Sequence, residues 1–419
     1  MSTLQGWADL PNDLLYSVVA RLGSFPDLLA FAATCPSWRA SISSYPSKST
    51  LLPPLLLQPG VPACSSRPRP RPLSNNLVLR RSCHVTDLAN KDTYMCCQIP
   101  QFACFCDSKS PSGPLDEFFL GSVSYGHLVL ANRQQSCLLV DVFTGVSVSA
   151  PQLPVNGRIL LNYAALTAPL SSPNSYLLVN VGRHNFFSRD GSDSWLRRSP
   201  RNGTFKKLVV FKDQVFGMDH DRMLYIVHLE PRIRIQKIAV HLDGSMANKW
   251  HLKQPWLAAC GDMLLMVGCQ KHSPSTGDAF EAFRLDVSTE PARWVKVEKL
   301  ENWAIFISID KRIQPLCCMN PETWGGRCNC IYCCNRKERV AFELGQPPQG
   351  DASNPKVYIH INCGSMMQPT WVVPILMMSW SVCSFLVQLV LKNCCTSREE
   401  NTASFAVSVR DVDSGRSTG

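Results

Sequence analysis

Short apolar runs separated by turn residues fill most of this chain, from Asn75 to about Val373, and no long amphipathic helix interrupts them. Runs rich in branched and aromatic residues, bounded by pairs such as Asp190-Gly191, predict β-strands. The clearest runs cover residues 127–131, 136–143, 175–181, 206–211, 222–229, 261–268, 279–287 and 356–362. The sequence therefore predicts a mainly β domain.

The number of these runs narrows the choice among β folds. Many short strands at near-regular spacing are typical of a sandwich, a barrel or a propeller. Because one sandwich domain holds only about 100 residues, a pattern about three times as long favours a β-propeller. No clear internal repeat is visible, so the number of blades stays open.

A compact helical unit is predicted ahead of the strands, between Trp7 and Tyr45. After Asn12, which suits a helix start, apolar residues recur at helical spacing until Gly23. Further short helices are expected to begin near Pro26 and at Pro36. Three short helices cannot bury all of this apolar surface among themselves. The excess is either a cap packed on the rest of the chain or a docking face.

The residues of the helical unit follow a recognisable pattern, with Leu10-Pro11 at its start and Cys35-x-x-Trp38-Arg39 at its end. This pattern resembles the F-box, the module that docks substrate receptors onto a Skp-type adaptor in cullin-based ubiquitin ligases. The resemblance implies that apolar residues of the unit contact the adaptor. The residues predicted for this role are Leu10, Pro11, Leu14, Leu15, Val18, Leu22, Leu28, Phe31 and Trp38.

The strand-rich part resembles a plant family in which an F-box precedes a kelch-like, KIB-type β-propeller. Residues 121–154 and 280–308 look like its blades, and the most specific match is CMNPETWGGRCNCIY at 318–332. Residues Trp371-Val-Val-Pro374 are similar to the element that closes the propeller in that family. The resemblance spans about residues 7–374.

These patterns divide the chain into four predicted parts. The parts are an F-box at 1–46, a proline-rich linker at 47–82, a propeller at 83–374, and an apolar segment with a polar tail at 375–419. Alternating Arg-Pro residues at 67–72 favour extended chain in the linker. The piece Leu51–Leu57 is too apolar for free chain, and we expect it to pack on the next domain.

Composition bears on the chain's partners and surroundings. The 419 residues are 45% hydrophobic and 18% charged, which is an ordinary globular balance. The net charge is +10, but no nucleic-acid motif accompanies it, so no nucleic-acid partner is predicted. The chain has 20 cysteines and no pattern of a secretory signal. Reduced thiols in the cytoplasm and/or the nucleus are therefore expected.

No catalytic constellation stands out, so a non-catalytic protein without a cofactor is predicted. The cysteines between Cys317 and Cys334 need a separate assessment, because Cys330-x-x-Cys333 has the spacing of a zinc ligand pair. A second pair would have to come from the adjacent Cys317 and Cys318, and neighbouring cysteines rarely bind one ion together. We expect a strand and a loop of a blade here, and no metal.

The run from Trp371 to Leu391 carries no charge and is long enough to span a bilayer. Pro374 and Gln388 weaken that interpretation. Three alternatives stay open: a membrane tail anchor, an apolar helix resting on the propeller, or a product of an unreliable gene model.

The two resemblances imply the substrate-recognition subunit of an SCF-type E3 ubiquitin ligase. Its partners would be a Skp-type adaptor, a cullin and an unknown protein substrate, and it would act by proximity and orientation. The alternative is a non-ligase propeller scaffold or binding protein, with or without a membrane anchor at residues 371–391. Substrate-binding residues are not predicted, because propeller specificity lies in loops that one sequence does not single out.

Overall fold

The computed structural model describes part of the chain in detail. The described residues are 6–22, 25–45, 54–59, 80–86, 88, 94–100, 102–103, 118–132, 134–142, 145–155, 161–170, 172–198, 204–242, 252–270, 280–308, 310, 312–334, 339–344 and 370–372. The chain divides into two units, 49–375 and the terminal segments 1–48 and 376–419. The strand predicted at 356–362, the Arg-Pro alternation at 67–72 and the apolar run beyond residue 372 lie outside the described residues.

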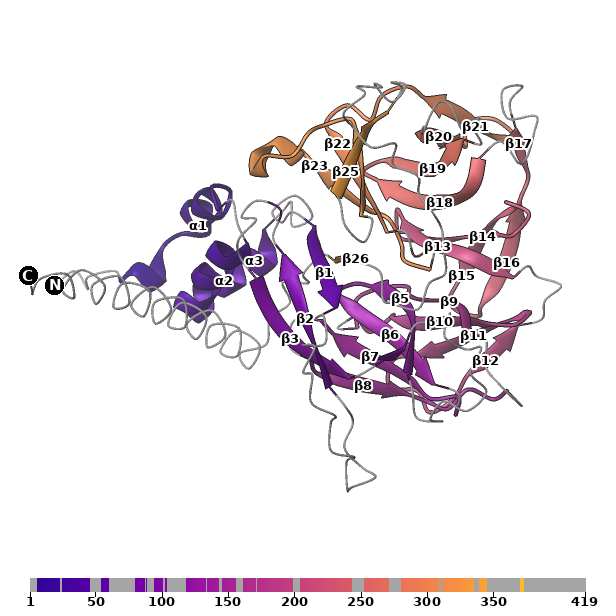
Figure 1. The fold of residues 1–419 in the computed structure, drawn as a ribbon, viewed down its shortest axis with the longest axis horizontal. Helices are drawn as coiled ribbons and strands as arrows, with labels where there is room; N and C mark the ends of the chain where they lie inside the picture. The colour runs from indigo at the N-terminus through magenta and orange to yellow at the C-terminus, as the bar shows by residue number, and fades with distance from the viewer. Residues whose placement is uncertain are drawn as a thin grey trace, which may run out of the picture. The chain divides into compact units, whose positions relative to one another are not determined.

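The helical unit contains the three predicted α-helices, preceded by a short 3-10 helix (Figure 1). They are η1 (Trp7–Asp9), α1 (Asn12–Val19), α2 (Phe25–Thr34) and α3 (Pro36–Ser44). Pro36 occupies the first turn of α3, where its missing N–H costs no hydrogen bond. The side chains that form the core of the unit are Leu15, Val19, Leu28, Phe31, Ala32 and Ile42.

Trp38 ties the elements of the helical unit together. Its ring lies 4.6 Å from that of Phe31, centroid to centroid, which joins α3 to α2. Its indole Nε1 donates a hydrogen bond to the carbonyl oxygen of Trp7, at 2.9 Å, which joins α3 to η1. The Arg39 Nε donates to the carbonyl of Ala32 at 3.2 Å. The Trp-Arg pair that ends the sequence pattern therefore has a structural role.

The strands of the second unit form six sheets, which are the blades of a β-propeller (Figure 1). Blade 1 contains β1 (Leu55–Pro59), β2 (Arg80–Thr86), β3 (Tyr94–Pro100) and β26 (Thr370–Val372). Blade 2 contains β4 (Phe102–Ala103), β5 (Phe118–Ser124), β6 (His127–Asn132), β7 (Cys137–Asp141) and β8 (Ser147–Ala150). Blade 3 contains β9 (Leu161–Leu166), β10 (Tyr176–Val181), β11 (His184–Arg189) and β12 (Leu196–Arg198).

The other three blades complete the ring. Blade 4 contains β13 (Phe205–Phe211), β14 (Gln214–Asp219), β15 (Leu224–His228) and β16 (Arg234–Ile238). Blade 5 contains β17 (Val240–Leu242), β18 (Leu252–Cys260), β19 (Met263–Gln270), β20 (Phe280–Asp286) and β21 (Ala292–Val297). Blade 6 contains β22 (Trp303–Ser308), β23 (Leu316–Met319), β24 (Cys330–Cys334) and β25 (Arg339–Glu343). The prediction of a mainly β propeller is confirmed. The number of blades, which the sequence left open, is six.

Most blades are antiparallel meanders that follow the sequence from the inner strand outward. Strand β9 lies beside β5 and β13, and β18 lies beside β13 and β23, so these strands line the centre of the ring. Blade 6 departs from this order, because β22 pairs antiparallel with β23 and parallel with β24. Two short strands extend other blades in parallel, β4 beside β5 and β17 beside β21.

The core lies between neighbouring blades, and this explains the apolar runs of the sequence. In β10, Leu177 and Val179 belong to the cluster shared with blade 2, whereas Tyr176 and Leu178 belong to the cluster shared with blade 4. Alternate side chains of a strand point to opposite faces. A strand with a neighbour on each face therefore needs apolar residues at nearly every position, and in β10 only Asn180 is an exception.

The ring closes by pairing the first strand of the propeller with the last. Strand β1 is antiparallel to β26, with Leu56 opposite Trp371. Leu55, Leu56 and Leu57 are buried, as expected for the apolar piece Leu51–Leu57. However, β1 lies inside the segment 47–82 that was predicted as a linker, so the propeller begins before residue 83. This strand could not be predicted, because prolines flank it and its partner β26 lies some 300 residues away in the sequence.

The motif at 318–332 supports the closure. Its short helix η6 (Pro321–Trp324) directs Trp324 toward the rings of Phe306 and Tyr332, whose centroids lie 6.0 and 6.4 Å away. The ring of Phe306 also lies 5.0 Å from that of Trp371 in β26. A side chain at Gly326 would collide with the Trp324 ring. The motif therefore shapes an aromatic cluster that holds the last strand.

A connection from blade 6 crosses the centre of the ring. We call residues 310–315, between β22 and β23, the cross-connection; all but residue 311 are described. The carbonyl of Arg312 accepts a hydrogen bond from Ser122 in blade 2, at 2.9 Å. The Gln314 amide donates to the Tyr163 hydroxyl in blade 3 at 3.0 Å and to the Leu208 carbonyl in blade 4 at 2.7 Å. One segment thus binds three blades from the inside.

Asp310 and Arg312 of the cross-connection form an ion pair with each other. The Arg312 guanidinium donates to both carboxylate oxygens of Asp310, at 2.9 and 2.6 Å. Burial raises the pKa of Asp310, but the hydrogen bonds and the charge of Arg312 outweigh burial, so the net pKa is lowered. The carboxylate is therefore stabilised in the folded protein.

Leu15→Ala should loosen the helical unit, because Leu15 is fully buried. A cavity of this kind costs about 2–5 kcal/mol. In the full chain, hydrogen exchange of the α2 and α3 amides should accelerate at least ~10-fold. Leu14→Ala is the matched control, because Leu14 is 54% exposed. Equal exchange in the two variants would contradict the packing.

Asp310→Asn should lower the melting temperature of the propeller, because it leaves the Arg312 guanidinium without this carboxylate; the cost is about 2–4 kcal/mol. Since the folded pKa of Asp310 is lowered, its stabilisation is present above the ordinary Asp pKa of about 4 and is lost as the pH falls through the folded pKa. The melting temperatures of wild type and variant should therefore converge below about pH 4. The exposed Asp213→Asn serves as control, and a difference independent of pH would refute the assignment.

Candidate functional site

The first helix carries an apolar strip on its outer face. Pro11, Leu14 and Val18 are spaced by three and four residues, which places them on one side of α1. Leu14 is 54% and Val18 is 41% exposed, whereas Leu15 and Val19, on the adjacent face of the helix, are fully buried. We call Pro11, Leu14 and Val18 the α1 strip. A solvent-exposed apolar strip on a short helix is the geometry of a helix-mediated contact.

Local sequence fixes where this strip begins. Pro11 is the N-cap of α1, and its carbonyl accepts hydrogen bonds from the amides of Leu14 and Leu15, each at 3.1 Å. Asp13 lies in the first turn, where its negative charge complements the helix dipole. The Leu-Pro pair therefore sets the phase of the helix, and with it which residues face solvent.

The structure sorts the nine predicted adaptor-contact residues into three groups. Pro11, Leu14 and Val18 are exposed; Leu10, Leu22 and Trp38 are half-buried; and Leu15, Leu28 and Phe31 lie in the core of the unit. The first group can touch a partner directly, whereas the last group shapes the surface from beneath. Adaptor contact by any of the nine stays a prediction.

Trp7 is a surface residue that the predicted set omits. Its side chain is 79% exposed, and its carbonyl is held by the Trp38 indole. Helical spacing gave no signal for it, because the non-helical residues Leu10 and Pro11 separate η1 from α1. An exposed tryptophan is a common anchor in protein interfaces.

The cysteines of residues 317–334 lie in strands, except Cys328, which lies in the turn before β24. Cys317 and Cys318 belong to β23, and Cys330 and Cys333 to β24. A hydrogen bond with the Cys260 thiol and burial raise the pKa of Cys317, and burial raises that of Cys318 to about 11. These two thiols are therefore protonated at neutral pH. Among the described residues, no three His, Cys, Asp or Glu side chains gather as metal ligands would.

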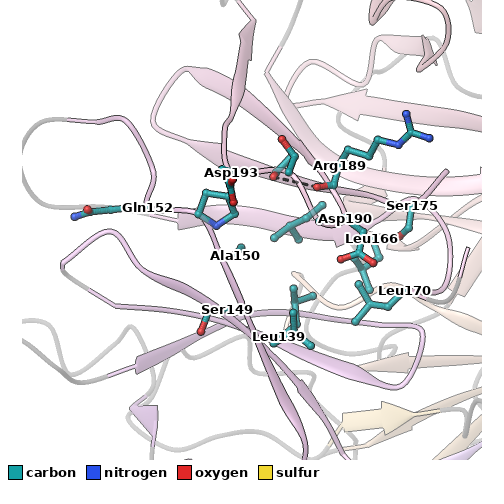
Figure 2. A pocket seen from close by; sticks show the side chains of 16 residues that line it. Leu139, Ser149, Ala150, Gln152, Leu166, Leu170, Ser175, Arg189, Asp190 and Asp193 are labelled. Atoms are coloured by element: carbon teal, nitrogen blue, oxygen red, sulfur yellow. Dashed lines mark hydrogen bonds between the residues drawn. The ribbon is translucent and has the colours of Figure 1, made fainter. Parts of the chain in front are cut away.

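A groove lies between blades 2 and 3 on the propeller, with a volume of about 400 Å³ (Figure 2). Its apolar lining includes Leu139, Leu166 and Leu177, which continue the core between the two blades. Its polar lining includes Asp190 and Asp193, on the turn between β11 and β12. No sequence pattern predicted this groove, because its lining comes from two blades and short polar segments.

A second hollow, of about 390 Å³, lies where blades 5 and 6 meet. It is lined by both signs of charge, including Arg284, Lys299 and Glu301. Lys296 in its wall is paired with Glu281 at 3.2 Å and with Glu298 at 3.7 Å. The hollow therefore has no dominant charge that would select a partner.

Membrane insertion was left open for residues 371–391. Within the part of the chain that the structure describes, no helix is long and apolar enough to cross a bilayer. The described residues end at 372, so all but the first two positions of this run fall outside them.

Comparisons with known proteins give few relatives of informative similarity. A search of curated proteins finds no match. Among solved structures, the N-terminal domain of Nup159 is 10% identical with a TM-score of 0.30, covering 52% of this chain and 56% of that one. The β-propeller domain of Myceliophteria thermophila Cps50 (Swd1) is 12% identical with a TM-score of 0.32, covering 64% and 77%. Apo AztD from Citrobacter koseri is 17% identical with a TM-score of 0.27, covering 55% of each chain.

The chain spans only about half the length of the Nup159 domain. Comparison with protein families is more informative than these distant structures. The F-box domain matches residues 7–50, which contain the helical unit. The KIB1-4 β-propeller matches residues 91–358, which is more than half of the chain. The protein therefore belongs to the KIB1-4 β-propeller family and carries an F-box domain ahead of its six-bladed propeller.

Proposed function

We propose that this protein is the substrate-recognition subunit of an SCF-type E3 ubiquitin ligase. The observation that carries the proposal is an F-box domain with an exposed apolar strip, on the same chain as a propeller that forms a separate unit. F-box domains typically bind Skp-type adaptors, and the propeller supplies a second, independent surface for a protein substrate. The subunit would work in the cytoplasm and/or the nucleus.

The proposed role needs no chemistry from this chain. The α1 strip and Trp7 would be buried against the adaptor, which links the receptor to a cullin. The propeller would hold the substrate near the ubiquitin-charged enzyme, and the gain in rate would come from proximity and orientation. A rigid receptor suits that task, and the cross-connection provides rigidity by tying blades 2, 3 and 4 to blade 6.

The docking energy should be concentrated in few side chains. Truncation of an interface residue matters most where the side chain is accessible in the free protein and fully desolvated in the complex. Leu14 and Val18 meet the first condition. Leu15 and Phe31 do not, and their substitution would weaken docking by disturbing the unit.

The double substitution Leu14→Ala/Val18→Ala should weaken binding of the full chain to a purified Skp-type adaptor at least ~10-fold, because each truncated anchor costs about 1–2 kcal/mol. The matched control is Val287→Ala, a 72% exposed residue on the propeller, which should bind as wild type. Affinity is measured by biolayer interferometry, and circular dichroism checks the fold. Wild-type affinity in the double variant, or no adaptor binding by the unaltered chain, would defeat the proposal.

A further inference from the structure

Strand β8 presents an unpaired edge on the outside of blade 2. It is the last strand of its sheet, and among the described residues it pairs with β7 alone. The Gly145 amide donates to the Asp141 carbonyl, and the Asp141 amide donates to the Val146 carbonyl, both at 2.9 Å. These two bonds form a bulge that fixes which residues of β8 bond to β7.

The bulge determines which residues of β8 form hydrogen bonds with β7, and it leaves the backbone groups of two residues exposed. Bonded and non-bonded pairs alternate along an antiparallel ladder. Val148, opposite Leu139, is therefore a bonded position. Ser147 and Ser149 are the non-bonded positions, so their N–H and C=O groups point away from β7. An edge of this kind can accept an additional strand.

The groove lies on the side of β8 that faces blade 3. Val148 lies opposite Leu139 and Ala150 opposite Cys137, so these side chains share the face that continues into the core between the blades. Val148 is nevertheless 43% exposed. The groove therefore has an apolar floor that the protein itself does not cover within the described residues.

The opposite rim of the groove is negatively charged. The exposed Asp190 and Asp193 lie on the turn between β11 and β12, and no described residue makes an ion pair or side-chain hydrogen bond with either carboxylate. The neighbouring Arg189 is occupied: it donates to the Pro173 carbonyl at 3.1 and 3.0 Å and lies 3.8 Å from Glu230. Figure 2 shows its guanidinium turned away from Ser149 and Leu139. The rim is therefore complementary to a cation.

Hydrogen bonds hold the end of the groove in place. The Trp195 indole donates to the Pro151 carbonyl at 2.9 Å, which joins the chain after β8 to blade 3. The Gln152 amide donates to the Gln134 carbonyl at 3.0 Å, which joins it back to blade 2. A surface that is already ordered loses little entropy when it binds.

We propose that this groove binds an extended segment of the protein substrate, which adds as a strand to β8. Side chains of a strand that point to one face recur at every second residue. The segment would place an aliphatic side chain against Val148 and, two positions away, a lysine or arginine against Asp190 and Asp193. A second copy of β8 would not fit, because Ser-Val-Ser-Ala contains no cation. That the segment belongs to a ubiquitination substrate rests on the proposed function.

The test measures binding of the full-length protein to an array of synthetic peptides, and binding to a Skp-type adaptor is measured separately. The peptides carry Val, Ile or Leu, then any residue, then Lys, Arg, Glu or Ser. Peptides with Lys or Arg should be retained at least ~10-fold more strongly than those with Glu, and added salt should reduce the difference. Equal retention of the Lys and Glu peptides would overturn the inference.

Two pairs of variants assign the binding to the groove. Ser149→Pro removes the outward N–H without touching the ladder to β7, whereas Ser149→Ala keeps it. Ser149→Pro should reduce peptide binding at least ~10-fold, and Ser149→Ala should not. Asp190→Asn/Asp193→Asn should abolish the preference for Lys over Glu, whereas the exposed Asp213→Asn should preserve it. If Ser149→Pro fails to fold, the preference for Lys over Glu in Asp190→Asn/Asp193→Asn decides whether the peptide binds in the groove.

The outcomes separate this inference from the proposed function. Leu14→Ala/Val18→Ala, prepared as the free chain, should lose the adaptor and keep the peptide preference. Adaptor binding with no peptide preference overturns the groove and leaves the ligase role intact. Peptide preference without adaptor binding supports the groove and defeats the ligase role. Dimerisation that Ser149→Pro abolishes would make a second copy the occupant, against the inference.

Discussion

Everything else in the propeller depends on the pairing of β1 with β26. Each blade buries one face against the blade before it and one against the blade after it, so an open ring would leave two apolar faces in water. The pairing of Leu56 with Trp371 removes that problem, and the ring of Phe306 packs on Trp371 from blade 6. The cross-connection reinforces the closed ring from within through its hydrogen bonds with Ser122, Tyr163 and Leu208.

Where local pattern and tertiary environment agree, the sequence predicts the fold well. Strand β10 has apolar residues at nearly every position because both of its faces are buried, and α1 shows helical spacing because one of its faces is buried. Strand β1 could not be predicted from its surroundings, since its partner comes from the far end of the chain. The parallel pairing of β22 with β24 leaves no mark in periodicity either, because strand order is a property of the sheet.

The two candidate sites also differ in how far the sequence predicts them. The F-box pattern identifies the right helices, but it mixes surface residues such as Leu14 with core residues such as Leu15, which differ only in which side of α1 they occupy. The groove between blades 2 and 3 escapes the sequence altogether. Its edge strand reads Ser-Val-Ser-Ala, and its two aspartates lie on a turn of a different blade. Only the arrangement of the blades brings them together.

Because the last strand closes the ring, the helical unit and the propeller are completed at different times during synthesis. The contacts of the helical unit join residues between Gly6 and Tyr45, so that unit can be complete as soon as these residues have left the ribosome. Blade 1 must wait for Trp371. At about 5–20 residues per second, the delay is on the order of tens of seconds. During that interval strand β1 can pair with β2, but its other edge, at Leu55–Leu57, lacks β26. The helical unit is therefore complete well before the ring of blades is closed.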